Sequence, residues 1–106
     1  MVPLASREAA VVVRVRVPSP LRSYTGGHAE VSVAVPLLAP ESPPTLDAVL
    51  AALDGRYAGM RFRMVDERGN LRAHIKLFIG NDLARDLRAR VESGTTVMIV
   101  AALSGG

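Results

Sequence analysis

The stretch Thr45-Leu-Asp-Ala-Val-Leu-Ala-Ala-Leu-Asp-Gly-Arg-Tyr57 decides the fold, because it carries a clear helical repeat of apolar residues. The repeat consists of side chains that would share one helix face: Leu46, Val49, Leu50, Leu53 and Tyr57. Thr45 is expected to cap the first turn, and Gly55 or Gly59 to end the helix. A helix of about twelve residues, roughly 18 Å long, must bury this stripe against another layer.

Residues before the helix alternate with period two, which indicates half-buried strands. Residues 9–17 and 30–35 each place valines on one face. The glycines within residues 21–27 favour a turn between them. We therefore expect an antiparallel hairpin in which Arg14 and Arg16 face Glu30.

Residues after the helix predict further strands. The pattern is clear in residues 73–79 and 96–103, whereas residues 61–65 read as a short strand or an extended stretch. Turns are expected at residues 67–70, 80–82 and 93–94. Three apolar side chains between the later strands are spaced like a helical or 3₁₀ segment: Leu83, Leu87 and Val91.

This order predicts an α+β fold. A single helix cannot cover both faces of a sheet, so it packs across one face of a mixed sheet of four to five strands. With the first and last strands central, the arrangement is a β-grasp. We expect an N-terminal extension at residues 1–9, the domain at residues 10–102 and a flexible tail at residues 103–106.

Composition excludes several classes of function. The chain has 106 residues, a net charge of +3 and no cysteine. No disulfide framework, thiolate-held cluster or cysteine nucleophile is therefore possible in this chain. Bases and acids intermix and aromatic residues are few, which disfavours nucleic-acid binding. No apolar run has the length of a membrane helix, and residues 1–8 do not resemble a secretory signal, so a cytoplasmic location is expected.

The last residues, Ser104-Gly105-Gly106, follow directly after a predicted core strand. Glycine lacks a Cβ, so two in succession can enter a narrow channel. We interpret this segment as a functional tail that carries a free carboxylate on a rigid body. The alternative is a frayed terminus with no role.

Hairpin, helix, strands and tail together resemble the ubiquitin-like sulfur-carrier family, which includes MoaD and ThiS. The features that carry the resemblance are Asn81-Asp82, the Val91-x-x-Gly94-x-x-Val97-x-Ile99 pattern and the Ser104-Gly105-Gly106 ending. The hairpin turn, with Leu21-Arg22 and Thr25-Gly26-Gly27, is similar to the CysO-like branch. The similarity extends over residues 10–106.

The resemblance implies a carrier that is a substrate of other proteins, not an enzyme. A MoeB/ThiF-like enzyme would use ATP to adenylate the carboxylate of Gly106. A sulfur donor would convert the adenylate to a thiocarboxylate, and a synthase or hydrolase would accept the sulfur. Leu103 and Ser104 would form the tail, and Gly105 would provide clearance. No cofactor bound to the chain itself is implied.

An apolar patch is expected on the sheet face that points away from the helix. If Ile75 and Leu77 face the helix, Phe78 faces away, and Met98 and Val100 do likewise on the last strand. Such a patch would be the surface that docks on the partner, as family members do. The alternatives are a covering loop or reversed faces.

Two alternative functions remain open on the sequence. The same tail could join target lysines as a protein modifier, or the domain could be an interaction module with an incidental tail. His28 and His74 are expected to be solvated, since no three or four metal ligands converge in the sequence. The arginines at positions 61, 63, 68 and 72 read as a solvated rim or a docking patch.

Overall fold

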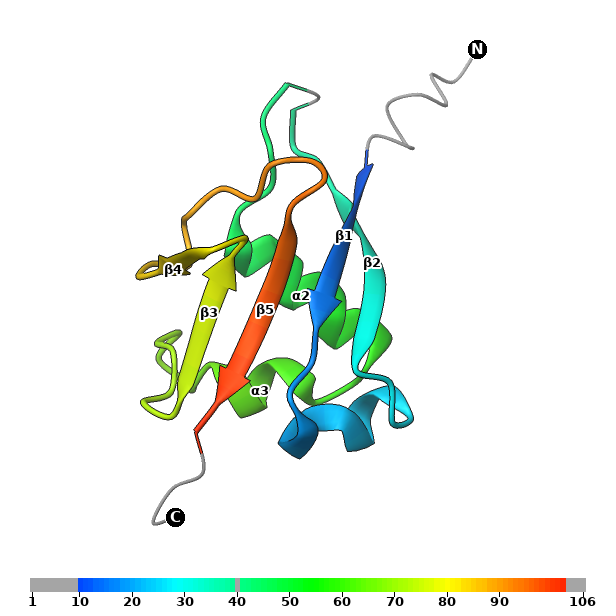
Figure 1. The fold of residues 1–106 in the computed structure, drawn as a ribbon. Helices are drawn as coiled ribbons and strands as arrows, with labels where there is room; N and C mark the ends of the chain where they lie inside the picture. The colour runs from blue at the N-terminus through cyan, green and yellow to red at the C-terminus, as the bar shows by residue number, and fades with distance from the viewer. Residues whose placement is uncertain (1–9, 40, 103–106) are drawn as a thin grey trace.

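The computed structural model describes residues 10–39 and 41–102 (Figure 1). Its elements in chain order are β1 (Ala10–Arg16), the 3₁₀ helix η1 (Ser19–Thr25), β2 (Glu30–Pro36), α2 (Leu46–Arg56), α3 (Met60–Met64), β3 (Ile75–Ile79), β4 (Asp82–Ala84) and β5 (Thr96–Ala101). The expected N-terminal extension and the tail at residues 103–106 lie outside the described residues.

The strands form one five-stranded sheet in the order β2-β1-β5-β3-β4. β1 and β5 run parallel at the centre, while the other neighbouring pairs are antiparallel. Helix α2 crosses one face of this sheet (Figure 1). The predicted α+β fold of the β-grasp type, with central first and last strands, is confirmed.

The first hairpin has the predicted register. Val13 lies opposite Val33 and Val15 opposite Val31, and all four side chains are buried. On the other face, Arg14 Nε lies 3.5 Å from a carboxylate oxygen of Glu30. The connection is more ordered than the expected turn, because residues 19–25 form η1, which Gly26 ends in the left-handed conformation.

Helix α2 begins where the sequence predicts. The Thr45 hydroxyl accepts a hydrogen bond from the amide of Ala48 at 3.1 Å, which caps the first turn. The expected apolar stripe faces the sheet, with Leu46, Val49, Leu50 and Leu53 fully buried. Gly55 does not end the helix, which continues to Arg56 and is capped by Tyr57.

The predicted extended stretch at residues 61–65 is wrong over residues 61–64, which lie in helix α3; only Val65 is extended, and it forms an isolated bridge with Leu71. The sequence Met-Arg-Phe-Arg-Met alternates apolar and charged residues, as a strand does. Met60 and Met64 also lie four residues apart, and both are fully buried on one side of the helix. Phe62, which a strand would place beside them, is 58% exposed.

The predicted helical segment through Leu83, Leu87 and Val91 is also wrong. Leu83 lies in the short edge strand β4, opposite Phe78 of β3. Val91 is fully buried and Leu87 packs partly against the core, but they do so from an irregular connection. Burial of these two side chains, rather than a helix, explains their apolar character.

Candidate functional site

The base of the tail is fixed by its position in the sheet. Strand β5 is hydrogen-bonded between β1 and β3, and the amide of Ala102 donates to the carbonyl of His74 at 2.8 Å. The predicted tail residues Leu103, Ser104, Gly105 and Gly106 lie beyond this point, outside the described residues. β5 pairs with β1 only over residues 96–98, whereas its pairing with β3 continues to Ala101. The chain therefore leaves the domain from a strand held by β3, at the end of the sheet near α3 and η1 (Figure 1).

The predicted docking residues share the sheet face that points away from α2. Phe78 on β3 lies directly opposite Met98 on β5, and Val100 lies two residues further along β5. All three side chains are half-buried, whereas their neighbours Leu77, Val97 and Ile99 are buried beneath α2. The structure thus brings the three predicted residues together in a row that leads toward the base of the tail.

Leu83 extends this apolar row, and the sequence interpretation missed it. It lies opposite Phe78 in the β3–β4 register and is 40% exposed. The sequence could have indicated this position. Leu83 follows the turn at Gly80 by only three residues, and a segment this close to the turn suits a short strand that runs antiparallel to β3. We call Phe78, Leu83, Met98 and Val100 the apolar row.

Basic side chains border the apolar row on the β1 side. Arg16 lies opposite Met98 and Arg14 opposite Thr96, on the same sheet face. With Glu30 and the residues around Gly80 and Asn81, they line a shallow hollow. The outer face therefore combines apolar contact area with positive charge.

A second set of charged residues lies around the base of the tail. The Arg63 guanidinium on α3 donates to the Tyr24 hydroxyl on η1, and this hydrogen bond raises the pKa of Arg63. Tyr24, Arg63 and His74 line one hollow. Arg72, two residues before His74, donates to the carbonyl of Phe62 at 2.8 Å and stacks 4.6 Å from the centre of its ring.

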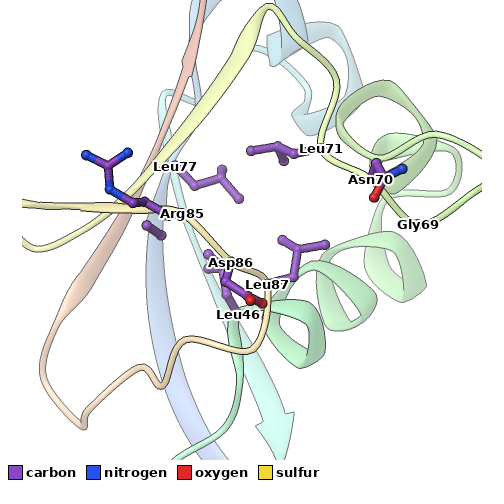
Figure 2. Close-up of a pocket in the computed structure, with 9 residues that line it drawn as sticks. Leu46, Gly69, Asn70, Leu71, Leu77, Arg85, Asp86 and Leu87 are labelled. Atoms are coloured by element: carbon purple, nitrogen blue, oxygen red, sulfur yellow. The ribbon is translucent and has the colours of Figure 1, made fainter.

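The best-defined pocket lies elsewhere, on the α2 side of the sheet (Figure 2). It measures about 240 Å³ and lies among four leucines: Leu46, Leu71, Leu77 and Leu87. Asn70, Arg85 and Asp86 surround it, and the neighbouring Arg88 lowers the pKa of the Asp86 carboxyl. Its lining holds no pair of nucleophile and general base, so it does not suggest an active site.

The histidines are placed as the sequence predicts. His28 and His74 are both exposed. Within residues 10–39 and 41–102, no three His, Cys, Asp or Glu side chains gather where they could hold a metal ion. In that same part of the chain, no helix has the length and apolar character needed to span a membrane.

No protein-family model matches the chain. Curated relatives do: the chain is 30% identical over 99 residues to the sulfur carrier protein CysO of Mycobacterium tuberculosis, an alignment that covers 89% of this chain and 98% of the relative. The same values hold for CysO of Mycobacterium bovis.

Solved structures agree with this relationship. The crystal structure of Mycobacterium tuberculosis CysO superposes with a TM-score of 0.72 at 28% identity, covering 86% of this chain and 99% of that one. A chain in the crystal structure of the BexX/CysO complex from Amycolatopsis orientalis superposes with a TM-score of 0.71 at 28% identity. The match covers 89% of this chain and 99% of that one. SAMP1 from Haloferax volcanii, at 22% identity, a TM-score of 0.73 and coverage of 90% and 99%, shares the fold.

Identity over nearly the whole length of the curated relatives settles the assignment, and the architecture of the solved relatives agrees with it. The relatives are carrier proteins rather than enzymes, in line with a fold that places an apolar row beside the base of a C-terminal segment. The chain belongs to the family of CysO-like sulfur carrier proteins.

Proposed function

We propose that this sulfur carrier holds its cargo on the carboxylate of Gly106. A carboxylate oxygen attacks the α-phosphorus of ATP, and pyrophosphate leaves, which forms an acyl-adenylate. Sulfide then attacks the acyl carbon and AMP leaves, which yields a thiocarboxylate. The adenylate step is needed because a carboxylate alone is a poor acyl donor.

The observation that carries the proposal is the position of β5. It is a central strand whose continuation is held by the Ala102–His74 hydrogen bond, immediately before the tail. From Leu103 to Gly106 the chain spans at most about 14 Å when extended. A partner that accepts the tail must therefore contact the domain surface at the same time.

We propose the apolar row as that contact. Phe78, Met98 and Val100 are half-buried and lead toward the tail, and Leu83 widens the row. Apolar area exposed on one sheet face, bordered by charge, is typical of a protein interface. The expected partners are a MoeB/ThiF-like adenylating enzyme, a sulfur donor and a synthase or hydrolase that accepts the sulfur. The absence of cysteine in the chain suits cytoplasmic reactions.

Intact-mass spectrometry of the chain purified from its own host tests this function. We expect a fraction whose mass differs by the replacement of one oxygen atom with sulfur, located at Gly106 by fragmentation. A variant that lacks Gly105 and Gly106 should never show it. Conjugates through Gly106 to lysines would instead indicate a protein modifier, and a cellular chain that extends uncut beyond residue 106 would contradict the proposal.

Phe78→Asp separates docking from chemistry. The variant should fold, yet its rate of adenylation should fall by at least tenfold, since an anchor residue in an interface commonly contributes about 2 kcal/mol or more. Lys76→Ala, on the same strand and face, is the matched control and should retain most of the rate. Equal rates for Phe78→Asp and the wild type would remove the apolar row from the proposal.

A further inference from the structure

The end of the domain from which the tail leaves is positively charged. The backbone carbonyl of His74 accepts a hydrogen bond from the amide of Ala102, and His74 lines the same hollow as Arg63. Arg72 precedes His74 by two residues and stacks on Phe62, the neighbour of Arg63 on α3. We call Arg63, Arg72 and His74 the collar.

The two guanidinium groups of the collar are held in place by neutral partners. Arg63 donates to the hydroxyl of Tyr24 and lies 5.8 Å from the centre of its ring. Arg72 donates to a backbone carbonyl and lies over the ring of Phe62. These contacts fix the side chains without cancelling their charge, so little ordering remains to be done when a partner binds.

Among the described residues, carboxylates form ion pairs with other arginines but not with those of the collar. The ion pairs found within residues 10–39 and 41–102 are Arg14–Glu30, Arg61–Asp47 and Arg88–Asp86. Asp66, the acid that follows α3, accepts from the backbone amides of Arg68 and Asn70 and so stabilises its own turn. Within residues 10–39 and 41–102, the two oriented guanidinium groups of the collar therefore have no carboxylate partner.

We propose that the collar recognises acidic side chains at the mouth of the partner channel that receives the tail. This inference rests on the proposed function and names the chemistry of the partner surface. A channel that accepts a tail of four residues must come within a few ångströms of the point where the tail begins. Arginine is suited to this role, because its planar group pairs with a carboxylate through two parallel hydrogen bonds.

The collar and the apolar row would then contribute differently. Apolar contacts supply most of the affinity, whereas charge at the rim of an interface mainly sets the association rate and the choice of partner. Carriers of the same fold with a neutral or acidic collar would be rejected by this partner.

The test measures binding of the full chain to the MoeB/ThiF-like enzyme of the same genome by calorimetry, without nucleotide. Arg63→Glu combined with Arg72→Glu should weaken binding by more than tenfold at low salt. The dependence of the dissociation constant on salt should become flatter. The double variant Arg63→Gln and Arg72→Gln neutralises the two charges without reversing them. It is used if the charge-reversed variant fails to fold.

Arg90→Glu is the matched control. Arg90 is also exposed and also donates to a backbone carbonyl, that of Pro43 at 2.7 Å. It lies in the connection that precedes β5, whereas the collar lies near the residue that follows β5. Its reversal changes the net charge of the protein without touching the collar. It should shift binding by less than threefold.

The outcomes separate this inference from the proposed function. If the charge-reversed collar binds and is adenylated like the Arg90→Glu control, the collar proposal is wrong and the proposed function stands. If the wild type binds through the collar but is never adenylated, the proposed function is wrong and the collar stands. A wild type that does not bind this enzyme at all contradicts both.

Discussion

The two faces of strands β3 and β5 both carry apolar residues, but the two faces differ in how far these residues are buried. On the face toward α2, Leu77 and Val97 have no exposed surface and Ile99 is 2% exposed. On the opposite face, Phe78 and Met98 lie beside each other, equally apolar but only half-buried. Nothing among the described residues of this chain buries that second face fully, which is why we propose it as a surface for contact with another molecule.

Adjacent aspartate substitutions give the most severe test of this contrast. Leu77→Asp should abolish cooperative folding, because an unpaired charge in the core costs about as much as the 5–15 kcal/mol that stabilises a typical domain. Phe78→Asp, one residue away, should keep the fold. Circular dichroism during thermal unfolding distinguishes the two. If both variants unfold, the outer face is part of the core.

Truncation to alanine makes the same comparison quantitative. Ile99→Ala should lower the free energy of unfolding by about 2–5 kcal/mol, because it leaves a cavity under α2. Met98→Ala should lower it by less than about 1.5 kcal/mol, since its side chain is already partly in water. Urea titrations of both variants supply the values. Similar losses at the two positions would contradict the contrast between the faces.

Loss of the helix cap should weaken the covered face alone. Thr45→Ala removes the acceptor for the Ala48 amide and should cost about 1 kcal/mol of stability. Hydrogen exchange should accelerate in the first turn of α2, while binding through the apolar row stays unchanged. Thr45→Ser keeps the hydroxyl and serves as the control. A change in partner binding with Thr45→Ala would mean that the two faces are coupled.

The ion pair between Arg14 and Glu30 on the outer face should contribute least to the stability of the fold. Arg14→Ala breaks the contact with Glu30, and the free energy of unfolding should change by less than about 1 kcal/mol, because exposed pairs are worth little. The difference from wild type should shrink further when the denaturation is repeated at high salt. A loss above 2 kcal/mol would show that charge on this face contributes to folding.

Much of the fold could be predicted because its local signals are unambiguous. The valines of β2 and of the second half of β1 alternate with polar or small residues, and the Thr45 cap precedes an uninterrupted apolar stripe. Helix α3 was missed because Met60, Phe62 and Met64 fit both a strand and a helix, and only burial decides between them. Residues 82–84 were misassigned because an edge strand of three residues carries almost no periodic signal.

The candidate site could also be predicted only in part from the sequence. Alternation within β3 and β5 predicts that Phe78, Met98 and Val100 share a face, but the direct pairing of Phe78 with Met98 depends on sheet register. The collar could not be predicted, since the contact between Tyr24 and Arg63 joins residues 39 positions apart. Such contacts follow from the packing of η1 against α3, which no local pattern specifies.

The strand order β2-β1-β5-β3-β4 has a consequence for biosynthesis. β5 is the last strand to be synthesised, and it lies between the β1–β2 hairpin and the β3–β4 hairpin. The strand that completes the sheet is also the one that precedes the tail. A chain that ends before Thr96 lacks the strand that joins the two hairpins, so we expect it not to form the complete sheet.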